Sequence, residues 1–167
     1  MIEATLERLF VKRFEKVLEG LGVQVVGTLQ PAMQDMVKGE EEGGMGVLVV
    51  KVQPRSYDTP TIPTCRINCA LSLSLRADLD YNGKTYFDVC SMLVNEMERL
   101  QKCLSDVHRE FAIPDEGFTP TGFQLGEGDT GVNVQSKVFS YTHTFTVFGV
   151  IDAHLWETPN GACLSCL

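Results

Sequence analysis

The chain has 167 residues, of which 44% are hydrophobic and 22% are charged. That length suits one domain and that composition suits a folded globular protein, which argues against a disordered or fibrous chain. Fourteen basic against 22 acidic side chains give a net charge of −8; this excess repels phosphate and anionic lipid at long range, and argues against nucleic-acid binding as the main task.

Membrane insertion and secretion are not expected either. The longest apolar runs, such as residues 46–50, are far shorter than the roughly 20 apolar residues that cross a bilayer. Residues 1–5 lack the basic start and apolar centre of a secretory signal. We therefore expect the protein to stay in the cytoplasm in which it is made.

The opening segment is predicted to be an amphipathic helix. Its apolar residues recur at intervals of three and four, and its charged residues lie mostly between them. The apolar set is Leu6, Phe10, Phe14, Val17, Leu18 and Leu21, and the charged set is Glu3, Glu7, Lys12, Arg13, Lys16 and Glu19. Gly20 and Gly22 readily take positive φ, so they predict the end of the helix before a first strand at 23–26.

Residues 29–46 are predicted to form a long loop. They show little periodicity, contain several glycines, and include the acidic run Glu40, Glu41 and Glu42. Loops of more than about 12 residues in a compact domain tend to be functional or disordered. A solvated insertion between two strands and a partner-binding arm both remain open, and the three glutamates are the candidate contact residues.

The clearest pattern lies at 65–80, after a strand predicted at 47–52 and a proline-containing irregular connection. Every odd position from Cys65 to Leu79 is apolar, and almost every even position is polar. Alternation over this length predicts an antiparallel strand with one solvated face and one core face. Cys65 and Cys69 are then expected to point inward.

A turn and a second helix are predicted next. The Tyr-Asn-Gly-Lys sequence at 81–84 is typical of a tight reversal. Thr85 can cap a helix, and Asp88 lies in its first turn, where its charge suits the helix dipole. The helix is predicted to reach Val107, with an apolar stripe of Phe87, Cys90, Leu93, Val94, Met97, Leu100, Leu104 and Val107.

The remaining pattern predicts a terminal hairpin of strands 121–125 and 132–151, because the connector at 126–131 is rich in glycine and aspartate. Apolar parity changes near Val138, which predicts a bulge there. Thr142, Thr144 and Thr146 would then line the outer face of the sheet.

These elements predict an α+β fold with a mostly antiparallel sheet of about five strands and two helices packed on one face. Residues 1–151 are expected to form a single domain containing the 29–46 loop. Residues 152–167 are expected to form a C-terminal arm or a frayed tail.

No catalytic, cofactor-binding or metal-binding residue is predicted. Six cysteines could form three disulfides in an oxidising compartment. Cys65 and Cys69 would lie about 13 Å apart on one strand, too far to bridge each other, and reduced thiols are expected. Cys163 and Cys166 form a lone C-x-x-C, whereas a structural zinc site needs four ligands. His108 and His143 are expected to be a helix-terminal and a half-buried sheet histidine.

The order of elements resembles the tail terminator proteins of long-tailed bacteriophages. The resemblance rests on the helix-then-strand passage at 6–26, the alternating strand 65–80 with its following helix to Val107, and the closing hairpin at 122–151 that ends in Thr-Phe-Thr-Val. Tail terminators are small α+β subunits whose hexameric ring caps the finished tail tube and joins it to the head.

The resemblance implies a homohexamer with two partners, the tail tube protein and a head-completion or neck protein. It implies a place in the virion tail or neck after assembly in the host bacterial cytoplasm, no cofactor and no catalysis. Six copies would carry a charge of −48, so a bore lined by part of it would let DNA pass without sticking. Glu40, Glu41 and Glu42 could face that lumen or contact the tube, and strand 65–80, as an edge strand, could extend its sheet across a subunit boundary.

Two other functional classes remain open. One is a small metal- or thiol-dependent enzyme that uses Cys163, Cys166 and nearby carboxylates. The other is a monomeric binding module of a cellular pathway.

Overall fold

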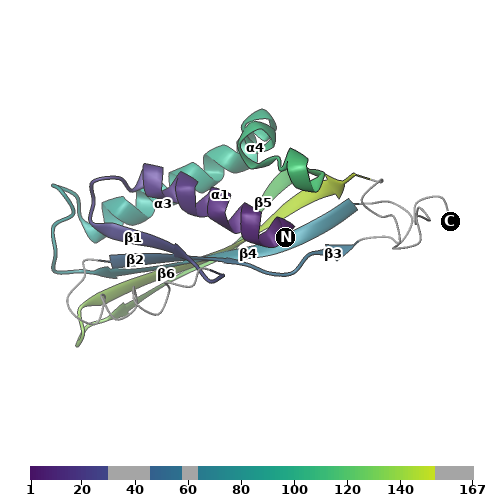
Figure 1. Cartoon of the computed structure of the whole chain (residues 1–167). Helices are drawn as coiled ribbons and strands as arrows, with labels where there is room; N and C mark the ends of the chain where they lie inside the picture. Colours follow the sequence, from purple (N-terminus) through teal and green to yellow (C-terminus); the bar gives the residue numbers. More distant parts are fainter. Residues whose placement is uncertain (30–45, 58–63, 153–167) are drawn as a thin grey trace.

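The computed structural model describes residues 1–29, 46–57 and 64–152. A layer of helices covers one face of a twisted sheet (Figure 1), which confirms the α+β class. The elements in chain order are α1 (Ile2–Val17), β1 (Val23–Gly27), β2 (Gly46–Val52), β3 (Ser56–Tyr57), β4 (Thr64–Arg76), α3 (Tyr86–Lys102), α4 (Leu104–Phe111), the 3-10 turn η1 (Pro114–Glu116), β5 (Phe118–Asn133) and β6 (Val138–Ile151).

The strand order is β1-β2-β4-β6-β5, with the two-residue β3 paired to β4. The prediction that 65–80 is an edge strand is therefore wrong, because β4 lies between β2 and β6 and ends at Arg76. Its predicted alternation is confirmed: odd residues from Cys65 to Leu75 are buried and point to the helices. Alternation of buried and exposed residues shows which face of a strand is exposed to solvent, but it does not show how many strands lie beside it.

One strand pair departs from the antiparallel rule. β1 and β2 are parallel, with Val23 opposite Gly46 and Gly27 opposite Val50. Parallel strands cannot be joined by a tight hairpin, so β1 and β2 do not form a hairpin although they follow each other in the chain. Side-chain periodicity does not encode strand direction, and the sequence did not predict this arrangement.

The core lies between the helices and the sheet, around Phe10 of α1. Its side chain is fully buried, and its ring centroid lies 4.4 Å from that of Phe111 and 5.2 Å from that of Phe145. α1 packs over β1 and β2, whereas α3 and α4 pack over β5. Segments from both ends of the chain therefore close one core.

Two helices stand where a single one was predicted after the turn. α3 begins as expected: the Thr85 hydroxyl accepts from Asp88 N–H at 3.2 Å, and the Asp88 carboxylate accepts from Thr85 N–H at 2.9 Å. The helix breaks at Cys103, whose φ and ψ of −119° and 85° are not helical. Leu104, which begins α4 just after this break, is 53% exposed, and Phe87 in the first turn of α3 is 66% exposed, so the predicted stripe does not hold at these two residues.

The reversal before α3 also follows its sequence. Asn82 and Gly83 take φ values of 53° and 83°, as the Asn-Gly pair predicts. Tyr81 is fully buried, and its hydroxyl donates to the Arg76 carbonyl at 2.9 Å. The turn is thus fixed to the end of β4.

The terminal hairpin turns later than predicted. Residues 126–131 belong to β5, and the reversal lies at 134–137. A side chain at Gly126 would place its Cβ 2.3 Å from Thr144 Oγ1, and one at Gly128 would lie 2.8 Å from His143 Nδ1. These glycines are needed for close packing against β6, and the prediction that they form a turn was wrong.

The bulge predicted near Val138 is also absent from that place. The register of the hairpin shifts between Pro120 and Gly122 and between Leu125 and Gly128, both in β5. In β6 the odd-numbered residues face the helices from the start of the strand. The change from even to odd apolar positions near Val138 therefore marks the passage from β5 to β6. The outer-face prediction for the threonines is confirmed, with Thr142 and Thr144 exposed.

Candidate assembly surfaces

Three of the four described cysteines are buried, and Cys103 is partly exposed. Cys65, Cys69 and Cys90 are buried and free of disulfides, and Cys65 and Cys69 face inward as predicted. Burial raises the pKa of the Cys69 and Cys90 thiols. Both thiols are therefore protonated at neutral pH, which is the unreactive form. Cys163 and Cys166 lie outside the described residues.

The described histidines and carboxylates do not gather into a metal site. No group of three or more His, Cys, Asp or Glu side chains there could hold a metal ion. His143 is half-buried as predicted, lies against the Tyr141 hydroxyl, and has its Nε2 3.1 Å from the Gly126 carbonyl. Burial raises the pKa of Tyr141 to about 12. This pair holds β5 and β6 together across the register shift.

A hollow of about 560 Å³ lies where α4, the start of β5 and the end of β6 meet. Apart from His108 and Asp152, its lining residues are not titratable, and they include Phe118 and Ile151. His108 lies in the last turn of α4, as predicted for a cation at a helix end.

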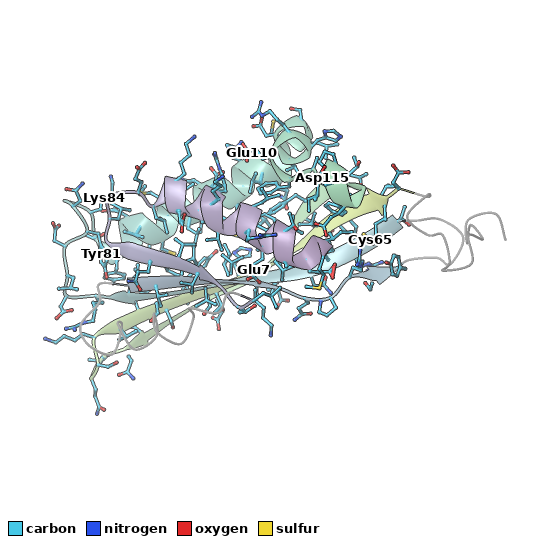
Figure 2. The ribbon with its side chains drawn as sticks, in the orientation of Figure 1. Glu7, Cys65, Tyr81, Lys84, Glu110 and Asp115 are labelled. Atoms are coloured by element: carbon cyan, nitrogen blue, oxygen red, sulfur yellow. The ribbon has the colours of Figure 1, made fainter. Side chains whose placement is uncertain are left out.

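Two glutamates of α1 are buried, although the helical pattern placed them on its polar face. Glu7 is 1% exposed; its carboxylate accepts from Leu29 N–H at 2.8 Å and from the Thr28 hydroxyl at 3.2 Å. It lies between α1 and the sheet (Figure 2). Glu3 is 6% exposed and lies 3.3 Å from Arg55 Nε. The two carboxylates fix α1 to the chain that follows β1 and β2.

An ionic cluster joins the three helices. Glu96 of α3 accepts from Arg13 of α1 at 2.6 Å and from Arg99 at 2.6 and 3.1 Å. Arg99 also donates to Asp106 of α4 at 2.6 Å. Burial alone would raise the pKa of Glu96, but the hydrogen bonds from Arg99 and Arg13 outweigh it and lower that pKa. The helical layer is therefore held as one unit.

The face of the sheet opposite the helices, here called the open face, is polar along β4 and β6, and no described helix lies over it (Figure 1). Its centre is formed by outward side chains of β4 and β6, and the exposed uncharged ones are Asn68, Ser72, Ser140, Thr142 and Thr144. Hydroxyl and amide groups in this number give a surface that hydrogen-bonds water or a partner without a strong charge.

The second half of β5 forms an exposed arm with its turn. All residues from 126 to 137 are exposed, including the apolar Val132 and Val134 at 58% and 82%. β5 is the last strand of the sheet and pairs only with β6 among the described strands. The sequence analysis placed a connector at 126–131 and began the second strand at Val132, so it missed this arm. The β-branched residues Thr130, Val132 and Val134 at alternate positions were the signal that could have indicated it.

The predicted contact residues Glu40, Glu41 and Glu42 lie outside the described residues. Within the described part, no helix is both long and apolar enough to cross a membrane. The surfaces that the structure does offer for assembly are the open sheet face and the β5 arm.

Comparison with known proteins gives a match in fold. No family model matches the sequence, and no curated protein matches it. A chain of the solved structure titled "Virion of native gene transfer agent (GTA) particle" superposes with a TM-score of 0.50 at 8% sequence identity. The match covers 89% of this chain and 93% of that chain. The α+β fold described above is therefore shared, over nearly its whole length, with a chain of a solved virion particle.

Proposed function

We propose that the chain is a structural subunit of a phage-like virion, and specifically that six copies form a tail terminator ring. The ring caps the tail tube, joins it to the head or neck, and lets DNA pass through its lumen. The observation that carries the proposal is the fold shared with a chain of a gene transfer agent virion over 89% of this chain. The order of helix, strand, long strand, helix and hairpin supports the finer assignment.

The distribution of side chains supports an assembly role. The large apolar residues fill one core between the helices and the sheet. Glu96, whose pKa is lowered, and Arg99, whose pKa is raised, connect the helices to one another. Among the described residues, a polar sheet face and the outer edge of β5 remain accessible, and such features bind other chains.

The proposed partners are other copies of the chain, the tail tube protein and a head-completion or neck protein. The proposed location is the tail or neck of the virion, after assembly in the cytoplasm of the bacterial host. Glu40, Glu41 and Glu42 are proposed to face the lumen or the tube. A net charge of −8 on each copy weakens binding to DNA phosphates at every point of the ring.

Light scattering after size-exclusion chromatography tests the ring. We expect a hexamer, or a monomer that forms rings when tail tubes are added, with annular particles in electron micrographs. A tight dimer that is unaffected by tubes would contradict the proposal. Stoichiometric zinc in the purified protein would instead favour the enzyme alternative.

The role of the acidic run is tested by changing Glu40, Glu41 and Glu42 together to Gln. If the run contacts the tube, rings still form but sediment with tubes less well. The matched control changes the exposed Glu15 of α1, Glu19 of the turn after it and Glu98 of α3 to Gln, which removes the same charge elsewhere. Equal losses in the two variants would mean that net charge alone is responsible.

A further inference from the structure

The free edge of β5 begins where the helical layer stops supporting it. At Leu125 the backbone N–H donates to the Gln101 side chain of α3 at 2.7 Å. Beyond this residue the contacts of β5 go to β6: Glu127 N–H donates to Thr144 Oγ1 at 3.1 Å, and Gly131 accepts from Ser140 at 3.4 Å. Residues 128–133 therefore present one row of backbone groups to β6 and the other to solvent.

This edge has few of the features that block pairing with another chain. Proteins protect edge strands with prolines, inward-pointing charges, short lengths or covering loops. Residues 126–133 contain no proline, and three of them are glycines, which let another backbone approach closely. Val132 adds an exposed apolar side chain at 58%. The edge is thus suited to strand addition.

The charges decide between two ways of pairing copies. Glu127 and Asp129 are the charged residues of β5, and both are exposed. Pairing β5 with the β5 of another copy would gather four carboxylates, which opposes association. β1, at the other end of the same sheet, has no charged residue. The charged residue of the neighbouring β2 is the exposed Lys51.

Asp129 and Lys51 also lie on the same face of the sheet. Asp129 lies opposite Thr142, whose side chain is on the open face, and Lys51 is on the open face of β2. A sheet that continues from β5 of one copy to β1 of the next would place these opposite charges on one face. They would be two strand spacings, about 10 Å, apart, within reach of the long lysine side chain.

We propose that the free edge of β5 binds the β1 edge of a second copy of this chain, head to tail, so that the sheet continues from subunit to subunit. Such a contact is heterologous, and repeated contacts of this kind close into a ring when the rotation permits. The inference rests on the proposed ring function and names the surfaces that build the ring.

Thiol cross-linking tests this contact. In a background with Cys103, Cys163 and Cys166 changed to Ser, Gln24→Cys and Asp129→Cys are combined in the full chain. Gln24 is opposite Val47, four residues or about 13 Å along the sheet from Lys51, so the cross-linker is a bis-maleimide that spans about 15 Å. We expect a ladder of covalent oligomers that ends at the ring size. Asp129→Cys alone should give none, and neither should Asp129→Cys combined with Lys12→Cys on the exposed face of α1.

The outcomes separate the contact from the ring. Rings by light scattering without the β1 to β5 cross-link would overturn the edge pairing and leave the ring function standing. Cross-linked dimers from Asp129→Cys alone would show that β5 pairs with itself, which also overturns it. A chain that stays monomeric at every concentration, even with tail tubes, would overturn both proposals.

A charge exchange gives an independent readout. Changing Glu127 and Asp129 to Lys is expected to weaken the ring, because like charges then meet across the contact. Rings should then dissociate at a protein concentration about tenfold higher than for the wild type. Adding Lys51→Glu should restore much of the loss. The same loss without any rescue would mean that the β5 arm contacts something other than the β1 edge.

Discussion

Replacing Glu96 by Gln would remove the charge that holds the helical layer together. The Glu96 side chain is 9% exposed, and it accepts three hydrogen bonds of 2.6 to 3.1 Å from two arginines. Glutamine keeps the shape and one acceptor oxygen, but its amide hydrogens face the guanidinium groups. The variant therefore leaves Arg13 and Arg99 without their closest counter-ion.

The size of the effect follows from the exposure of the partners. Breaking a fully buried ion pair on one side costs about 3–5 kcal/mol. Arg13 and Arg99 are 24% and 32% exposed, and Glu110 lies within 3.7 Å of Arg13 and 3.4 Å of Arg99. Water and Glu110 offset part of the loss, so we expect a decrease of about 2 kcal/mol in the free energy of unfolding.

Urea unfolding at pH 7 and fixed protein concentration measures this decrease. Concentration is fixed because assembly adds to apparent stability. The control is Glu98→Gln, an exposed carboxylate on the same helix, which should change the free energy of unfolding by less than about 0.5 kcal/mol. Equal effects of the two substitutions would refute the assignment of the cluster as a stabilising contact.

The pH dependence gives a second check with a definite sign. The pKa of Glu96 is lowered in the folded state, so its contribution is present above the ordinary value of 4.5 and is lost as pH falls through the folded-state pKa. The stability curves of the wild type and Glu96→Gln should therefore converge in acid. A difference that persists unchanged at low pH would show that the loss at neutral pH has another origin.

Three further substitutions test the core, a helix cap and a close contact. Phe10→Ala empties the centre of the aromatic cluster and should lower the free energy of unfolding by about 3–5 kcal/mol in urea titrations. Thr85→Ala removes the capping box of α3 and should cost about 1 kcal/mol, measured in the same way. Gly27→Ala would place a Cβ 2.0 Å from the Glu7 carboxylate and should lower the thermal midpoint. A double-mutant cycle with Glu7→Ala should show that the two losses are not additive, and additive losses would contradict the contact.

Local signals in the sequence were sufficient for most elements. The helix at α1, the alternation of β4 and the Thr85 cap of α3 each depend on residues within a few positions of one another. Helical and strand periodicities, caps and tight turns are properties of short segments. For this reason the α+β class and the inward direction of Cys65 and Cys69 could be predicted before the fold was known.

The candidate assembly surface could not be predicted in the same way. Glycine at 126–131 favours a turn when only its neighbours are considered, yet the side chains of Thr144 and His143 across the hairpin require glycine at two of these positions. The missing side chains at Gly126 and Gly128 leave room for β5 to lie against β6 at these positions.

The sequence by itself determined the first helix, the start of the second and the alternating faces of β4, because each follows from the spacing of residues along the chain. Only the tertiary structure decided that β4 is central, that β1 and β2 are parallel, and that β1 and β5 form the ends of the sheet. It also decided that the Glu7 side chain is buried between α1 and the sheet. The physical reason is that strand neighbours and buried polar partners are set by contacts between residues far apart in the sequence, to which local periodicity is blind.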